Sequence, residues 1–110
     1  MVKKKKDKMS NGYISIVKLN NNKYFIAHTQ FDIQLYLSDF KRKILMIPWV
    51  FVNKPIGVIR TFECSRDYLN YHILQYMQLK GIHNVRGGGY SDINLSRAQL
   101  RTIQQCVQDI

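Results

Sequence analysis

The chain has 110 residues, 45% of them hydrophobic, which suits one compact domain and excludes two. It carries 17 lysine and arginine residues and 7 acidic ones, and the formal charge of +10 favours anionic partners such as nucleic acid. The longest apolar run, Ile44 to Val52, has about half the ~20 residues that a membrane helix needs, so we expect no membrane partner.

The positive charge is concentrated in two clusters. Residues 1–11 contain five lysines and one aspartate, a net charge of +4, and we expect a flexible basic tail ahead of one folded domain at residues 12–110. Such a run fits either a solvated tail or an arm that becomes ordered on phosphate. The residues of the two clusters that we predict as nucleic-acid contacts are Lys3, Lys4, Lys5, Lys6, Lys41, Arg42 and Lys43.

Cysteine and histidine spacing argues against a metal site. Cys64 and Cys106 form no CxxC motif, and the three histidines have no metal-ligand spacing. We therefore expect free thiols, an intracellular reducing compartment, and no structural metal.

The first half of the domain predicts a β-hairpin. Tyr13–Leu19 and Lys23–His28 are rich in β-branched and aromatic residues, and Asn20–Asn22 lies between them. Asparagine tolerates the positive φ of tight hairpin turns, so the two strands should pair antiparallel. Gln30–Phe40 fits both strand alternation and helical spacing, and periodicity alone leaves it open.

The second half predicts a strand and two helices. A loop around Pro48 and Trp49 leads to a third strand at Pro55–Glu63. The next helix should follow an N-cap at Ser65 and end at Gly81. A glycine loop follows, and then a last helix is predicted. Ser96 with Gln99 fits a capping box, and Leu95 with Leu100 fits a hydrophobic staple. The apolar stripe of this helix consists of Leu100, Ile103, Val107 and Ile110.

Several segments, in this order, resemble the GIY-YIG nuclease family. The hairpin is similar to the paired strands that name the family, and Trp49 with the strand from Pro55 is similar to its tryptophan and third strand. The most specific segment, Tyr76 to Tyr90, resembles the helix end and the asparagine-valine-arginine-glycine-glycine run of members from large double-stranded DNA viruses. The resemblance implies an α+β fold, a small three-stranded antiparallel sheet flanked by helices, with Gln30–Phe40 as helix.

The same resemblance implies that the catalytic side chains have been replaced. Active members use one divalent metal held by a glutamate, tyrosines near the attacking water, and an arginine on the phosphate. The two tyrosine positions fall on Ser15 and Phe25, the arginine on Gln34 or Leu35, and the glutamate on Leu69 or Asn70, while one asparagine is retained as Asn84. Without the carboxylate, little offsets the cost of dehydrating Mg²⁺, so we expect no catalytic residues, no metal and no cofactor.

Three local features leave alternatives open. Glu63 or Asp67, with Tyr13, could form a shifted site that binds Mg²⁺. Arg86 beside Gly87–Gly89 could hold a phosphate, or the glycines could only permit a tight turn. Aromatic residues interleaved with basic ones fit base stacking, although their positions on predicted core faces favour packing.

The predicted function is therefore a non-catalytic nucleic-acid-binding module built on this scaffold, with Arg86 added to the predicted contacts. One alternative is a virion component that packs in a viral protein assembly, placing the protein in the host cytoplasm or the virion. A second alternative is an active, metal-dependent endonuclease with a rearranged site.

Overall fold

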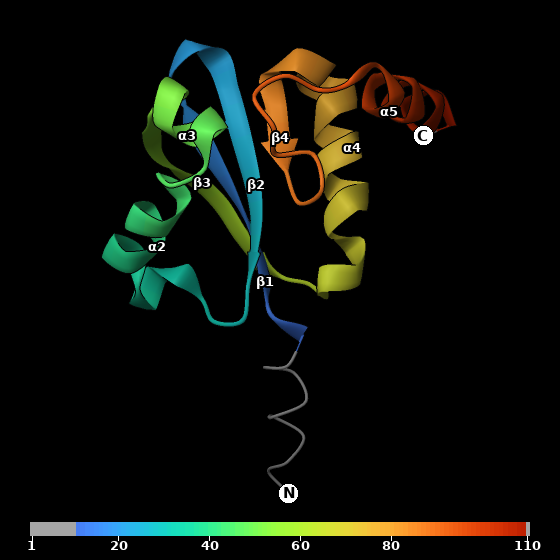
Figure 1. Cartoon of the computed structure of the whole chain (residues 1–110). Helices are drawn as coiled ribbons and strands as arrows, with labels where there is room; N and C mark the ends of the chain where they lie inside the picture. The colour runs from blue at the N-terminus through green and yellow to red at the C-terminus, as the bar shows by residue number, and fades with distance from the viewer. Residues whose placement is uncertain (1–10, 110) are drawn as a thin grey trace, which may run out of the picture.

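Four strands form one sheet in the order β3-β1-β2-β4 (Figure 1). The strands are β1 (Tyr13–Leu19), β2 (Lys23–Thr29), β3 (Pro55–Glu63) and β4 (Val85–Gly87). The computed structural model describes residues 11–109, with side chains up to residue 107. The predicted tail, apart from Asn11, lies outside the described residues, as does Ile110 of the predicted apolar stripe.

The α+β class is confirmed, but the prediction of three antiparallel strands is wrong about the sheet. β1 pairs antiparallel with β2 and β3 as predicted, and β4 adds a fourth strand that pairs parallel with β2. This strand lies within the predicted glycine loop. A Cβ at Gly87 would collide with the Ile26 carbonyl oxygen, so a residue without a side chain is what allows β4 to approach β2.

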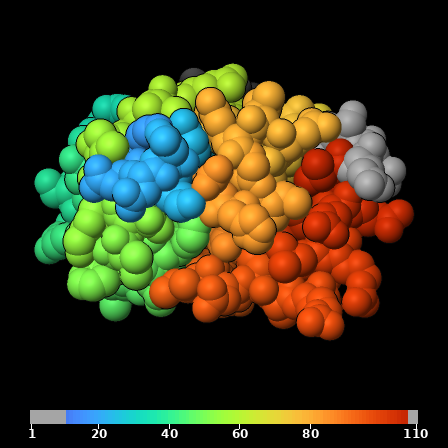
Figure 2. Space-filling model, turned by 90° about the horizontal axis from the view of Figure 1, so that it is seen from above, coloured from blue at the N-terminus to red at the C-terminus, as the bar shows by residue number. Residues whose placement is uncertain are grey.

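The asparagine turn forms as the sequence predicts. Asn20–Asn22 make one 3₁₀ turn, in which Asn21 and Asn22 have φ values of 65° and 59°. Figure 2 looks down on this end of the molecule, where the turn (blue) lies between the α3–β3 segment (green) and the segment around residue 80 (orange). The Asn20 amide donates to the Lys54 carbonyl at 3.0 Å, which ties the turn to the start of β3.

The segment that was ambiguous in the sequence is a helix only in part. A 3₁₀ turn spans Ile33–Leu35, and α2 (Leu37–Ile44) begins later and ends later than predicted. The region predicted as a loop contains a short helix, α3 (Pro48–Asn53). Pro48 occupies its first turn, where the fixed φ of proline suits a helix and its missing N–H is not needed.

The last two helices follow their predicted caps. A 3₁₀ turn (Arg66–Tyr68) precedes α4 (Leu69–Lys80), and the Ser65 hydroxyl caps this turn by accepting a hydrogen bond from the Asp67 amide. The helix ends at Gly81, which has a φ of 103°. The capping box before α5 (Arg97–Asp109) is present in both directions: the Ser96 amide donates to Gln99 Oε1 at 2.8 Å, and the Gln99 amide donates to Ser96 Oγ at 3.0 Å.

Helices cover both faces of the sheet, so the fold has three layers (Figure 1). Alternate strand residues point to opposite faces, and both sets are apolar. One face packs against α4 and α5 through Ile14, Ile16, Tyr24, Ile26, Leu69, Ile73, Met77, Val85 and Ile103. The other packs against α2 and α3 through Val17, Leu19, Phe25, Ile33, Phe40, Ile44, Trp49 and Val50.

The edge strand β3 is irregular. Its pairing with β1 shifts register twice, because two residues of β3 have no partner on β1. These unpaired residues are Ile59 and Ile56. Both skipped isoleucines are exposed. Extra residues of this kind bend a strand and increase its twist.

Candidate nucleic-acid interface

A groove of about 300 Å³ opens along β2 where the pairing with β4 ends. β4 pairs only as far as Ile26, so among residues 11–109 no strand lies beside the edge of β2 beyond it. Residues 25–29 form the floor; Lys43 and Ile47 lie on the α2 side, and Arg66 and Gly88 on the α4 side. We call this the β2-edge groove.

The charged side chains of the β2-edge groove are both cations. Lys43 and Arg66 are exposed, and no aspartate or glutamate is among its lining residues in the described part of the chain. They come from different elements, α2 and the turn before α4, and the fold brings them to one groove. Two cations with ordinary hydrogen-bond donors can bind the phosphate oxygens of a nucleic-acid backbone.

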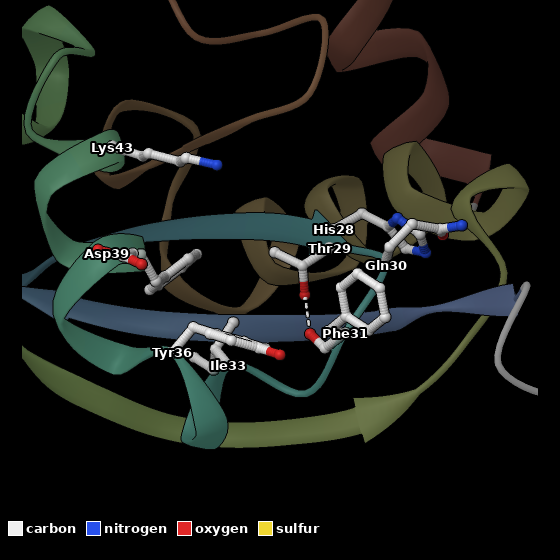
Figure 3. Close-up of a pocket in the computed structure, with 9 residues that line it drawn as sticks. His28, Thr29, Gln30, Phe31, Ile33, Tyr36, Asp39 and Lys43 are labelled. Atoms are coloured by element: carbon white, nitrogen blue, oxygen red, sulfur yellow. Dashed lines mark hydrogen bonds between the residues drawn. The ribbon is translucent and has the colours of Figure 1, made fainter.

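A second hollow, of about 590 Å³, continues from this groove beneath α2 (Figure 3). We call it the α2 hollow. It shares His28, Thr29, Phe40 and Lys43 with the β2-edge groove. In Figure 3, Lys43 extends from α2 along one side, while the rings of Phe31 and Tyr36 lie on the other. Asp39, the one carboxylate that lines it among the described residues, forms an ion pair with Arg42 one helical turn later.

The predicted basic tail joins the domain beside these hollows. Asn11, its last residue, has its carbonyl oxygen 2.8 Å from His28 Nε2, and the Cys64 carbonyl lies 2.9 Å from the same nitrogen. Both partners are acceptors, so Nε2 carries the proton. Because His28 lines both hollows, the tail enters the described structure next to the candidate interface.

Of the predicted contacts within the described residues, Lys41, Arg42 and Lys43 are exposed on α2, whereas Arg86 is 2% exposed. The Arg86 guanidinium donates four hydrogen bonds to carbonyl oxygens and lies 4.2 Å from the centre of the Trp49 ring. Reaching a phosphate would break these contacts, so we leave Arg86 out of the proposed interface. Lys3, Lys4, Lys5 and Lys6 lie outside the described residues.

The two positions aligned with family tyrosines are closed to solvent. Ser15 is fully buried, and its hydroxyl lies 3.2 Å from that of Thr61 on β3. Phe25 is 4% exposed, packs in the core beneath α2 and α3, and contributes to the floor of the groove. Both side chains therefore have a packing role.

The positions aligned with the arginine and the glutamate lie apart from each other. Gln34 and Leu35 are exposed on the 3₁₀ turn before α2. Leu69 is buried in the core under α4. Asn70 is exposed and lies beside Gly88, because a Cβ added at Gly88 would be 2.8 Å from the Asn70 Oδ1 atom.

Asn84 connects the hairpin to the end of α4. Its Nδ2 donates to the Lys80 carbonyl at 2.7 Å, and its Oδ1 accepts from Lys23 Nζ at 2.7 Å. Asn70 is at the opposite end of α4, about 15 Å away along the helix at 1.5 Å per residue. The structure therefore does not bring the predicted site residues together.

The residues of the shifted-site alternative come together only in part. Tyr13 and Glu63 line one pocket beside β3, together with Asp32 and Arg60, while Asp67 is elsewhere, on the turn before α4. Among the side chains that the structure describes, no three histidine, cysteine or acidic groups lie closely enough together to hold a metal ion.

Sequence reasoning missed the residues that complete the two hollows. Arg66 lies in the turn before α4, and His28 lies next to the end of β2, so neither had a motif of its own. Phe31 and Tyr36 belonged to the ambiguous segment. The available signal was the interleaving of aromatic and basic residues, which does not say which rings are exposed.

Comparison with protein-family profiles, with curated proteins and with solved structures gives no match to this chain. The GIY-YIG resemblance therefore stays a prediction. Cys64 and Cys106 both carry free thiols. Among the described residues, no helix has the length and apolar character that crossing a bilayer demands.

Proposed function

We propose that this protein is a non-catalytic nucleic-acid-binding module on a degenerate GIY-YIG-like scaffold, and that it holds the phosphate backbone in the β2-edge groove. The observation that carries the proposal is the meeting of Lys43 and Arg66 across a groove lined, in the described residues, by no carboxylate. Lys41 and Arg42 are also exposed on α2 and add positive charge around this helix, with Arg42 paired to Asp39. The closely spaced phosphates of a nucleic-acid backbone attract cations grouped in this way.

The predicted tail supports the same proposal. It contains five of the chain's lysines and joins the domain at Asn11, next to a residue that lines the groove. Its positive charge and that of the groove would then act on one stretch of nucleic acid, raising the rate of encounter and the dependence on salt.

The test is a titration of labelled DNA and RNA oligonucleotides, followed by fluorescence anisotropy between about 50 and 200 mM salt. Binding should weaken steeply with salt. In the double variant Lys43→Ala with Arg66→Ala, the slope of log K against log[salt] should fall by roughly 1.4 to 1.8, because each lost phosphate contact contributes about 0.7 to 0.9.

The matched control is Arg101→Ala, which removes an exposed charge from α5, on the far side of the fold from α2 (Figure 1). It should leave most of the affinity. If Arg101→Ala weakens binding as much as Lys43→Ala or Arg66→Ala does alone, the affinity depends only on the net charge of the protein, and the groove is not the site. Replacing Lys3, Lys4, Lys5 and Lys6 by glutamine tests the tail separately.

The protein-interaction alternative has one observation in its favour. Phe51, Val52, Ile56 and Ile59 on α3 and β3 are exposed apolar side chains. Co-purification of a defined protein assembly that is lost in Phe51→Ser with Ile56→Ser, while oligonucleotide binding is unchanged, would support it over the nucleic-acid module.

A further inference from the structure

Two aromatic side chains stand exposed in the α2 hollow, beside the proposed phosphate site. We propose that Phe31 and Tyr36 form a stacking platform for an unpaired base, so that the partner of this protein is a single-stranded nucleic acid. This inference rests on the proposed function and specifies which form of nucleic acid the interface recognises.

The rings are placed as a platform and not as part of the core. Phe31 is 55% exposed and Tyr36 53% exposed, and neither belongs to either of the two buried clusters. Their centroids are 6.1 Å apart with an angle of 64° between the ring planes. Each ring therefore braces the other edge to face, while about half of each side chain stays open to a ligand.

The backbone around the rings is held by local hydrogen bonds. Thr29 Oγ1 donates to the Phe31 carbonyl at 2.7 Å (Figure 3), and the Tyr36 amide donates to the Ile33 carbonyl at 2.9 Å. Ile33 between them is buried in the core. A platform held in this way loses little conformational freedom when a base binds, which favours affinity.

The charges next to the rings fit a nucleotide. Lys43 lines both the α2 hollow and the β2-edge groove, so a phosphate bound to it would lie beside the hollow that the two rings line. Asp39, which also lines the hollow, is paired with Arg42. The hollow has about 590 Å³, which lies within the roughly 300 to 1,000 Å³ of typical small-ligand sites.

The choice of single strand follows from which surface of a base is free. In a duplex the base faces are covered by their neighbours, and only the base edges are accessible in the grooves. An aromatic side chain therefore stacks most easily on an unpaired base, because in a duplex it would first have to unstack or flip out a base. Rings beside a cationic groove are the combination that single-strand binders use, and stacking is tolerant of sequence because every base has a π face.

The experiment compares three labelled ligands on the full chain: a single strand, the duplex of the same sequence, and the same single strand with abasic sites. The first variant, Phe31→Leu with Tyr36→Leu, keeps apolar bulk but removes both rings. The second, Phe31→Tyr with Tyr36→Phe, keeps both rings and is the matched control. Circular dichroism and thermal unfolding verify that each variant is folded.

The wild type should bind the intact single strand more tightly than the duplex and the abasic strand. The leucine variant should bind the intact single strand about 5- to 30-fold more weakly, as expected for roughly 1 to 2 kcal/mol of stacking, and should bind the other two ligands almost as the wild type does. The ring-preserving variant should keep most of the affinity.

Two results would overturn the inference. One is a leucine variant that binds all three ligands as the wild type does, and the other is an equal loss on all three. In both cases the proposed function survives if Lys43→Ala with Arg66→Ala still weakens binding. If the wild type binds none of the ligands at about 50 mM salt, the proposed function and this inference fail together.

Discussion

The guanidinium of Arg86 lies 4.2 Å from the centre of the Trp49 ring, which joins β4 to α3 across the edge of the sheet. The same guanidinium donates hydrogen bonds to the carbonyl oxygens of Ile82, Val85, Asp92 and Ile93. Its charge therefore organises the chain on both sides of β4.

Replacing this arginine by lysine should destabilise the protein. Arg86→Lys keeps the charge but has no planar fork to satisfy the four carbonyls, and we expect the free energy of unfolding to fall by about 2 to 4 kcal/mol. Urea unfolding followed by the fluorescence of Trp49, the one tryptophan in the sequence, measures this directly. Arg101→Lys on α5 is the control, with an effect within about 0.5 kcal/mol. Equal stability of the two variants would contradict the structural role of Arg86.

Gly87 and Gly89 make a matched pair for testing β4. A Cβ at Gly87 would collide with the Ile26 carbonyl oxygen, whereas a Cβ at Gly89 meets nothing within 4 Å. We expect Gly87→Ala to cost more than about 2 kcal/mol, because β2 and β4 must separate, and Gly89→Ala to change stability by less than about 0.5 kcal/mol. Thermal unfolding of both variants gives the comparison, and similar melting temperatures would argue against close pairing of β4.

His72 should make stability depend on pH. Burial, and then the nearby positive charge of Arg60, lowers the pKa of His72 below its ordinary value of 6.5. The unfolded chain therefore binds more protons than the folded one in this range, and stability rises with pH. The contribution of neutral His72 to the free energy of unfolding is complete above pH 6.5, and it is lost as the pH falls from 6.5 through the lowered pKa.

The measurement is urea unfolding at a series of pH values below neutrality. His72→Gln should flatten the pH profile in that window, while His83→Gln, on an exposed side chain, should keep the wild-type profile. A His72→Gln profile that parallels the wild type would show that another group is responsible.

The rearranged-nuclease alternative makes its own prediction. With plasmid and Mg²⁺ or Mn²⁺, we expect no cleavage, since Ser15 and Phe25 offer no phenol and Glu63 and Asp67 lie on different elements. Cleavage that disappears in Glu63→Ala or Tyr13→Phe, which share one pocket, would establish an active site beside β3. Asp67→Ala provides the comparison for the other carboxylate.

Local signals in the sequence predicted a large part of the fold. The asparagine turn, the bounds of β3, the stop at Gly81 and the Ser96 capping box all depend on residues close together in the chain. β4 escaped prediction because its three residues form a strand only through Gly87 packing on Ile26, sixty-one positions earlier.

The candidate site was harder to predict for a related reason. The basic cluster on α2 is visible in the sequence, but its partner Arg66 comes from the turn before α4 and carries no motif. Arg86 shows the opposite case: a charged residue beside glycines suggests anion binding, yet it is committed to carbonyl oxygens that only the folded chain assembles.

The two skipped residues of β3 bear on how the protein behaves when concentrated. A strand from another molecule that paired with the outer edge of β3 would meet irregularly spaced amide and carbonyl groups at Ile56 and at Ile59, so it could not form a continuous hydrogen-bond ladder along the strand. The opposite border offers only short segments, because β4 spans three residues and β2 continues past it for only three more. The sheet formed by the described residues therefore offers no long template, on either border, for stacking copies into cross-β fibrils.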